Sequence, residues 1–416
     1  MGRLNQAAEI LHDGYFPPGE TELQDLGNRG RYVRRPVVNE TPDVYRMLQR
    51  HIDVMPVGFP ATESGVELKI LRRLFTPEEA EAALLLSALP EPLPRIHRRA
   101  PKGRWTAAEM ETLLDRLAGK GAIMGGGGAT PGRKKKWSKA MLALGMYEFQ
   151  VDRLTPEMQR DMERYIAEGF AGAFLGPKTK QMRTIPVNAT IVVERLVGRY
   201  DDARELIAGS DGPWAVLNCV CRQGRDLTGE PCRQTDVRKT CLALKGVARH
   251  VVESGSGEEL TREGALGLLD RAEREGMVLQ PENAQDPLFI CFCCGCCCGV
   301  LRMAKQFPRP ADFVHSNFRA EVNAEACIDC ESCRPRCPMD ALGTEDGKTA
   351  VDHGRCIGCG ACVGVCPSEA LRLVPKERPA APPESHTALY KKIVVERFGV
   401  LETARMIGSA LLGRRV

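Results

Sequence analysis

Two segments of the sequence carry the same cysteine spacing, and this repeat limits the possible folds more than any other feature. Residues 327 to 338 read CIDCESCRPRCP, and residues 356 to 367 read CIGCGACVGVCP. Each is C-x2-C-x2-C-x3-C-P, and the copies are 29 residues apart. Zinc sites commonly combine two cysteine pairs separated by a longer loop, whereas each copy here supplies four closely spaced cysteines. The spacing is therefore not the usual one of a zinc site.

The repeat resembles the bacterial two-cluster ferredoxin domain, and the resemblance covers residues 318–375. In that family a three-cysteine loop wraps one face of a [4Fe-4S] cube, and the fourth cysteine of the motif binds the other cube. The resemblance thus implies two [4Fe-4S] clusters. Their expected ligands are Cys327, Cys330, Cys333 and Cys366 for one cluster, and Cys356, Cys359, Cys362 and Cys337 for the other.

Ten further cysteines precede the repeat, and all eighteen in the chain follow residue 218. Four have the spacing C-x-C-x10-C-x8-C, which supplies enough thiolates for one four-coordinate iron–sulfur or zinc site. Six occur within eight residues, in the segment CFCCGCCC. We expect this region to bind metal through Cys219, Cys221, Cys232, Cys241, Cys291, Cys293, Cys294, Cys296, Cys297 and Cys298.

The segment CFCCGCCC leaves several ligand arrangements open. If the residues before it form a strand, Cys291 and Cys293 share one face while Cys294 points away. Six neighbouring cysteines cannot all reach one cube, so either the segment wraps between two centres or some cysteines pack as small apolar side chains. At least one additional iron–sulfur cluster is expected, with a zinc site or free thiols as alternatives. The segment resembles cysteine-rich extensions beside ferredoxin domains in anaerobic redox proteins.

The N-terminal half is predicted to be mostly helical. An extension, residues 1–55, precedes a domain of residues 56–150. Capping boxes at Thr76 and Thr106 each predict the start of a helix, and the second helix covers residues 106–119. A glycine-rich stretch and the basic run Lys134 to Lys136 follow. This order resembles a winged-helix domain.

The winged-helix resemblance implies DNA binding, with the helix of residues 106–119 in the major groove and the lysines on phosphates. A docking platform is the alternative interpretation. The helix carries Glu109, Glu111 and Asp115, which would face phosphate unfavourably.

The remaining segments complete a multidomain α+β chain. A cysteine-rich α/β middle domain is expected over residues 151–310, with a helix starting at Thr155 and a short strand at Thr190–Val193. A proline-rich linker and a C-terminal helix are expected over residues 376–416. That helix is predicted to have an apolar face formed by Val394, Phe398, Leu401, Ala404, Leu411 and Leu412.

Composition and motifs restrict the function. No export signal and no apolar run of membrane-spanning length is evident, which favours a cytoplasmic protein whose thiols are kept reduced. No nucleotide-binding motif is present, and no catalytic residue can be named. The main hypothesis is therefore an electron-transfer protein that serves a redox enzyme or carrier protein. The alternatives are a redox-sensing DNA-binding regulator and an oxidoreductase with an open cluster in the middle domain.

Overall fold

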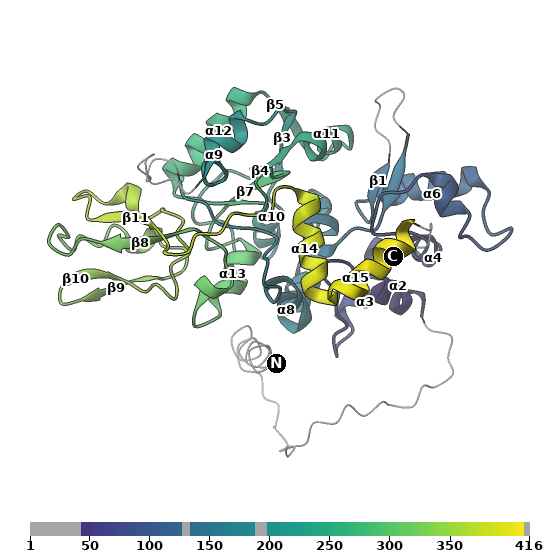
Figure 1. Ribbon diagram of the computed structural model, residues 1–416, viewed down its shortest axis with the longest axis horizontal. Coiled ribbons are helices and arrows are strands. Elements are labelled where there is room, and N and C mark those ends of the chain that lie inside the picture. Colours follow the sequence, from purple (N-terminus) through teal and green to yellow (C-terminus); the bar gives the residue numbers. More distant parts are fainter. Residues whose placement is uncertain (1–42, 127–133, 188–197, 412–416) are drawn as a thin grey trace, which may run out of the picture.

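The computed structural model describes residues 43–126, 134–187 and 198–411. N-terminal helices lie at one end of the long axis, a five-stranded sheet lies near the middle, and the strands of the cysteine repeat lie at the other end (Figure 1). Helices and strands are mixed, as the predicted α+β class requires. The predicted strand Thr190–Val193 and most of the predicted extension, residues 1–42, lie outside the described residues.

The N-terminal region contains five described helices and a hairpin. Both predicted capping boxes are confirmed: the Thr76 and Thr106 hydroxyls accept from backbone amides three residues later, and the glutamates there accept in return. The hairpin extends to Glu91, whose backbone pairs with that of Trp137. The elements are α2 (Val44–Asp53), α3 (Val66–Leu74), α4 (Pro77–Ala83), α5 (Leu93–His97), α6 (Ala107–Gly119), β1 (Met124–Gly126) and β2 (Lys136–Ser138).

The basic segment before β2 contacts the acidic side of α6. Lys135 Nζ lies 2.9 Å from a Glu111 oxygen and 2.6 Å from an Asp115 oxygen. These two carboxylates raise the pKa of Lys135, Asp115 having the larger effect. The lysine that the sequence suggested for phosphate contact is therefore already paired within the domain.

A second group of helices connects the N-terminal region to the sheet. The Thr155 hydroxyl caps α7 as predicted, accepting from the Met158 amide at 3.2 Å. Leu144, in the irregular turn η1, has a left-handed backbone with φ of 57°. The elements are η1 (Leu142–Met146), η2 (Glu148–Gln150), α7 (Pro156–Tyr165), η3 (Ile166–Phe170) and α8 (Ala171–Leu175).

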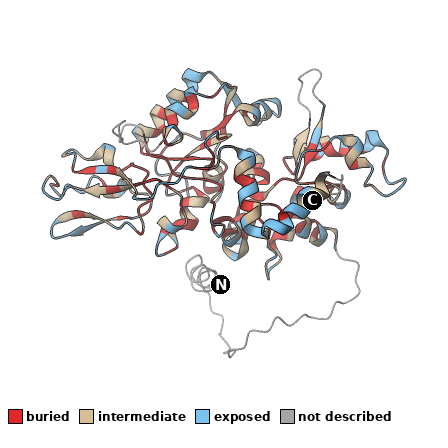
Figure 2. Ribbon diagram, in the orientation of Figure 1, coloured by how far each residue is buried: buried red, intermediate tan, exposed pale blue. Residues whose placement is uncertain are grey.

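The central sheet is antiparallel throughout, with the strand order β5-β3-β4-β7-β6. Figure 2 shows that buried residues concentrate in this sheet and in the helices around it. Its strands are β3 (Trp214–Asn218), β4 (Lys239–Leu244), β5 (Glu258–Leu260), β6 (Val278–Pro281) and β7 (Phe289–Cys293). The accompanying helices are η6 (Arg199–Asp201), α9 (Ala203–Ala208), α10 (Val220–Leu227), α11 (Lys245–Glu253), α12 (Arg262–Glu275), α13 (Gly299–Lys305) and η7 (Pro310–Asp312).

The two faces of the sheet have different partners. Leu242 and Leu244 of β4, with Ile290 and Phe292 of β7, pack in one core with residues of α9 and α12. Alternate residues of the same strands, including Cys241 and Cys291, pack in the core that contains the N-terminal helices. Because side chains alternate along a strand, two of the cysteines point away from α9 and α12.

The cysteine repeat forms two short antiparallel pairs. Strands β8 (Phe318–Val322) and β11 (Leu371–Pro375) pair with each other, as do β9 (Leu342–Glu345) and β10 (Lys348–Val351). A 3-10 turn ends each cysteine loop: η8 (Arg334–Arg336) in the first and η9 (Val363–Val365) in the second. Strands β8 and β11 therefore bring the two ends of the repeat together.

The C-terminal segment corrects one prediction. Two helices form rather than one, α14 (His386–Phe398) and α15 (Val400–Leu411), separated by Gly399 with φ of 80°. The predicted apolar face is wrong: the buried side chains of α14 are Leu389, Tyr390 and Ile393, while Leu401 is 81% exposed. Leu412, the last residue of that face, lies outside the described residues.

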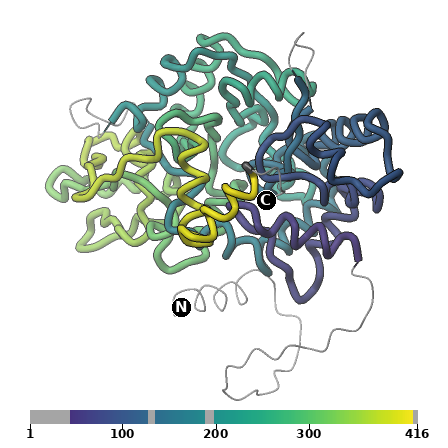
Figure 3. The backbone as a smooth tube through the Cα atoms, turned by 45° about the vertical axis from the view of Figure 1, so that its right-hand side comes forward, coloured from purple at the N-terminus to yellow at the C-terminus, as the bar shows by residue number. Residues whose placement is uncertain are grey.

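Helix α14 lies against the N-terminal half, and Figure 3 shows it crossing the front of the molecule. Arg397 donates to the Met55 carbonyl at 2.6 Å, and the Thr179 hydroxyl donates to Glu396 at 2.7 Å. The C-terminal segment therefore connects back to the N-terminal region.

Candidate iron–sulfur and metal centres

The two copies of the cysteine repeat have the same backbone conformation. Positive φ values occur at equivalent positions, 29 residues apart: Asp329 and Gly358, Glu331 and Gly360, and Asp340 and Glu369. The amides of Cys327 and Cys356 likewise donate to carbonyls four residues earlier. The repeat in the sequence therefore corresponds to a repeat in the structure, with each loop curling around its three cysteines.

The two loops differ in their surroundings. We call residues 327–333 the outer loop and residues 356–362 the inner loop. The outer loop has an exposed Cys330 and an Ile328 that is 64% exposed. In the inner loop, a Cβ at Gly358 would lie 2.1 Å from the Phe318 carbonyl oxygen, so β8 packs directly on the backbone there. A glycine is required at this position because β8 leaves no space for a Cβ, whereas Asp329 adopts a similar φ in the outer loop.

The structure brings Cys337 to the inner loop, although it belongs to the first motif. Burial raises the pKa of the Cys362 thiol well above its usual value, and the nearby Cys359, Cys337 and Cys356 raise it further. Backbone amides donate to these sulfurs: Ala341 to Cys337 at 3.2 Å and Ala320 to Cys356 at 3.4 Å. Buried thiols with amide donors are the environment that an iron–sulfur cluster requires.

The middle region separates its ten cysteines into two sets. The first, which we call the six-cysteine set, borders a partly open cavity of about 70 Å³, which Cys294 and Cys297 of the second set also line. The predicted strand is confirmed by β7, which directs Cys291 toward Cys241 on the neighbouring strand β4. Thiol contacts continue from Cys291 to Cys293, then to Cys298, Cys221 and Cys219. The set is Cys219, Cys221, Cys241, Cys291, Cys293 and Cys298.

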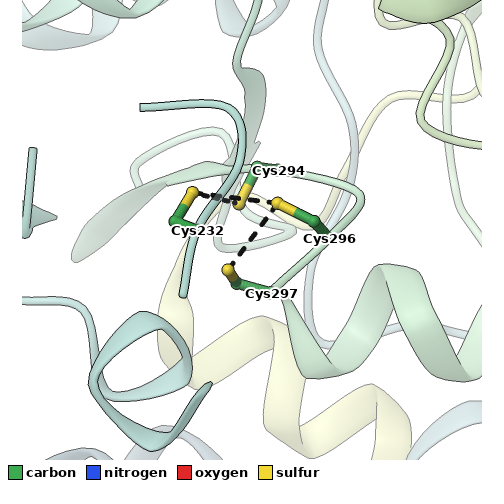
Figure 4. Close-up of side chains that lie close together, drawn as sticks. All are labelled: Cys232, Cys294, Cys296 and Cys297. Atoms are coloured by element: carbon green, nitrogen blue, oxygen red, sulfur yellow. Dashed lines mark hydrogen bonds between the residues drawn. The ribbon is translucent and has the colours of Figure 1, made fainter. Parts of the chain in front are cut away.

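The second set is compact and consists of Cys232, Cys294, Cys296 and Cys297 (Figure 4). Their sulfur atoms all lie within 4.8 Å of one another. Cys232 Sγ is 3.6 Å from Cys294 Sγ and 3.7 Å from Cys296 Sγ, and the latter is 3.7 Å from Cys297 Sγ. We call this the four-cysteine set. In this set Cys232 lies beside cysteines of the segment CFCCGCCC. The other three cysteines of the C-x-C-x10-C-x8-C pattern, Cys219, Cys221 and Cys241, belong to the six-cysteine set.

Arg222 lies between the two sets and is completely buried. Its guanidinium donates to the Phe292 carbonyl at 3.0 Å and to the Thr240 hydroxyl. Burial alone would lower the pKa of Arg222, but Cys219 of one set and Cys294 of the other raise it above its usual value. A permanent cation here offsets negative charge on both sets of thiolates.

In the sequence, Arg222 is one of several arginines near the cysteines. Two of the others pair with carboxylates: Arg225 with Glu163 and Arg238 with Asp226. The burial of Arg222 between the two sets results from the pairing of strands that are distant in the sequence. No sequence pattern predicts it.

Glu148 also borders the cavity and was not anticipated. Burial raises the pKa of its carboxyl to about 7, although the carboxylate accepts from the Gly145 amide at 2.8 Å. The cavity therefore contains an acid that can hold or release a proton near neutral pH.

The four-cysteine set directly adjoins the cysteine repeat. A Cβ added at Gly295, between Cys294 and Cys296, would lie 3.0 Å from the Cα of Pro338, the residue after Cys337. Arg336 donates to the carbonyls of Glu275 at 2.7 Å and Arg274 at 2.9 Å, and Lys305 pairs with Asp340 at 2.6 Å. The thiolate sites of the middle region and of the repeat are thus packed against each other.

Comparison with known proteins identifies one part of the chain. Residues 320–373 match the family model described as a 4Fe-4S dicluster domain. No curated protein and no solved structure matches the chain. Within the described residues, no helix has the length and apolar character needed to cross a membrane. Residues 320–373 are therefore an iron–sulfur domain of the ferredoxin type, set within a longer cysteine-rich chain.

Proposed function

We propose that this protein transfers electrons between a redox partner and a metal centre in its middle region, through the ferredoxin-like domain. The observation that carries the proposal is the direct packing of the ferredoxin-like domain on the middle region, where Gly295, between Cys294 and Cys296, meets Pro338, the residue after Cys337. Iron–sulfur clusters with complete thiolate ligation supply one-electron transfer.

Within this proposal, each of two [4Fe-4S] clusters is held by one loop and the distant cysteine of the other motif. Cys327, Cys330, Cys333 and Cys366 hold the outer cluster, and Cys356, Cys359, Cys362 and Cys337 hold the inner one. The position of Cys337, which lines the same small cavity as the three inner-loop cysteines, supports this exchange. The six-cysteine set would hold at least one further iron–sulfur cluster, since its thiols border a cavity with more space than a single ion fills.

The outer loop is the proposed site for the redox partner. It presents the apolar Ile328 beside Asp329 and Glu331, two carboxylates that share a single cationic partner, Arg334, and so leave a net negative charge. An apolar contact next to acidic side chains suits a partner with a basic surface, because charge complementarity speeds encounter and fixes orientation.

The cavity favours a second candidate function, an oxidoreductase whose active centre lies in the middle region. Six thiols exceed the four that one cube requires, and Glu148 supplies a proton-exchanging group at the same cavity. An electron delivered there would then be used in substrate chemistry. This candidate predicts that a substrate changes the spectrum of the middle centre without changing those of the ferredoxin-like domain.

DNA binding is the weaker hypothesis. The order of α5, α6, β1 and β2, with the pairing of Glu91 and Trp137, is compatible with a winged helix. However, Lys135 is engaged by Glu111 and Asp115 of α6, so the helix proposed for the groove presents carboxylates beside the basic segment. We interpret this domain as a docking platform.

The test is an anaerobic purification, followed by counts of iron and acid-labile sulfide and a potentiometric titration monitored by electron paramagnetic resonance. About twelve irons and at least three one-electron centres are expected. Replacing Cys219, Cys221 and Cys291 together by alanine, which leaves only three thiols of the set, should remove the third centre and leave the ferredoxin signals. Val300→Ala, which changes the same cavity wall without removing a thiol, should retain all three centres. About eight irons and only two centres in the wild-type protein would overturn the multi-centre relay.

A further inference from the structure

We propose that the four-cysteine set, Cys232, Cys294, Cys296 and Cys297, binds one tetrahedral metal ion, zinc or iron, and not an iron–sulfur cluster. This site is distinct from the clusters discussed above and does not depend on the electron-transfer role.

The sulfur–sulfur distances carry the inference. Zinc lies about 2.3 Å from each thiolate sulfur in a tetrahedral site, so the sulfurs at its corners are separated by about 3.8 Å. Three of the separations in the four-cysteine set are 3.6, 3.7 and 3.7 Å. They match the edge of a tetrahedron around a single ion.

An iron–sulfur cluster requires a wider arrangement. In a cube each thiolate binds a different iron, and in a two-iron cluster the thiolates form two pairs on opposite sides. Neither arrangement allows all four sulfurs to lie within 4.8 Å of one another, as they do here. The ferredoxin-like domain serves as an internal comparison. In the part of the chain that the structure describes, its eight cysteines form no group as compact as this one.

The local structure supports a closed, ordered site. Cys294 and Cys297 are buried, and the amide of Cys298 donates to the Cys294 carbonyl at 3.1 Å, which bends the chain between them. Cys232 comes from the loop between α10 and β4, more than 60 residues earlier in the chain. Four thiolates around a divalent ion leave a net negative charge, which the buried Arg222 partly offsets.

The ion would also organise the contact with the ferredoxin-like domain. Gly295 lies within the metal loop and meets Pro338 directly, and Arg233 and Gln234, next to Cys232, border the same groove as Arg336 and Asp340. Binding one ion would therefore fix both segments that face the ferredoxin-like domain. We assign the ion a structural role at this junction.

The wild-type protein provides the first test. Purified without oxygen, it should contain either about one zinc per chain or one iron in excess of acid-labile sulfide. X-ray absorption at the corresponding edge should show one shell of sulfur at about 2.3 Å, with no metal–metal scattering if the ion is zinc. Equal iron and sulfide with no zinc would overturn the proposal, as would zinc bound through nitrogen or oxygen.

Two matched cysteine substitutions provide the second test. Cys232→Ser should remove that single ion and leave the sulfide content unchanged. Cys291→Ser should retain the ion, even if the substitution lowers the iron and sulfide contents by equal amounts. Loss of about four irons and four sulfides from Cys232→Ser would show a cluster here and refute the proposal. A wild-type protein with the ion but only two clusters would leave this inference intact and refute the third redox centre, so the two proposals fail separately.

Discussion

The ferredoxin-like domain and the middle region use their cysteines in different ways. In the domain, each loop keeps its three cysteines on one concave backbone, and positive φ values recur at the same positions in both copies. In the middle region, adjacent cysteines separate: Cys293 and Cys298 face the cavity with Cys219 and Cys221, while Cys296 and Cys297 join Cys232. The ligands of a loop that wraps one centre can be predicted from the cysteine spacing. The ligands in a segment that runs between two centres cannot.

The largest expected effect comes from removing a thiolate of the inner loop. Cys359→Ala should lose about four irons and four sulfides per chain, because its cluster has no spare thiolate. Metal and sulfide counts on anaerobically purified protein measure this loss. Ile328→Ala, which changes an exposed side chain of the outer loop, should retain the full complement. An unchanged iron count in Cys359→Ala would contradict the ligand assignment and weaken the contrast between the two regions.

Removing the buried cation should produce the next largest effect. Arg222→Met leaves thiolates of both sets without their counter-charge, so we expect a loss of about 3–5 kcal/mol in the free energy of unfolding. Thermal unfolding of the metal-loaded protein should show a markedly lower Tm. Arg238→Met, which breaks a half-exposed pair with Asp226, should cost less than about 1 kcal/mol. Similar Tm values for the two variants would argue against Arg222 as the shared counter-charge.

The segment that joins the two regions should weaken in acid. Burial, with the charges of Arg183 and Lys376, lowers the pKa of His315 to about 4, while its carbonyl accepts from the Thr184 amide at 2.8 Å. The folded state binds fewer protons than the unfolded state below about pH 6.5, so stability falls from there until about pH 4. The loss is up to about 3 kcal/mol.

Unfolding midpoints measured between pH 7 and pH 4 test this dependence. His315→Gln should flatten the profile, while the same substitution at the exposed His353 should leave it as in the wild type. An unchanged profile in His315→Gln would place the acid sensitivity elsewhere.

The smallest expected effect concerns docking. Arg336→Ala removes two hydrogen bonds to the end of α12, for a cost of about 1–2 kcal/mol. Amide hydrogen exchange should increase in residues 274–278 and 336–340. Arg334→Ala, whose pairs with Asp329 and Glu331 stay within the outer loop, should leave exchange at the junction unchanged. Equal exchange in both variants would mean that Arg336 does not hold the regions together.

Sequence reasoning succeeded where the determining contacts are local. The capping boxes at Thr76 and Thr106 act over three residues, and the first three cysteines of each C-x2-C-x2-C-x3-C-P motif lie within one short loop. The alternation of Cys291 and Cys293 on one face of a strand is likewise a property of the strand itself.

The same reasoning could not determine the rest because it depends on distant contacts. The partner of Cys296 is Cys232, which only the fold brings near, and the burial of Arg222 follows from the strands around it. In the C-terminal segment, Gly399 ends α14, and the contacts of Arg397 and Glu396 with the N-terminal half determine which face is buried. Periodicity alone indicated the wrong face.

The glycine at position 295 has a consequence for electron tunnelling, whose rate falls steeply with distance. Its backbone meets Pro338 without an intervening side chain, and even a methyl group there would be too close to Pro338. A side chain at this position would require Pro338 to shift by a few tenths of an ångström. The short gap that an electron would cross between the two regions therefore depends on the absence of a side chain at this position.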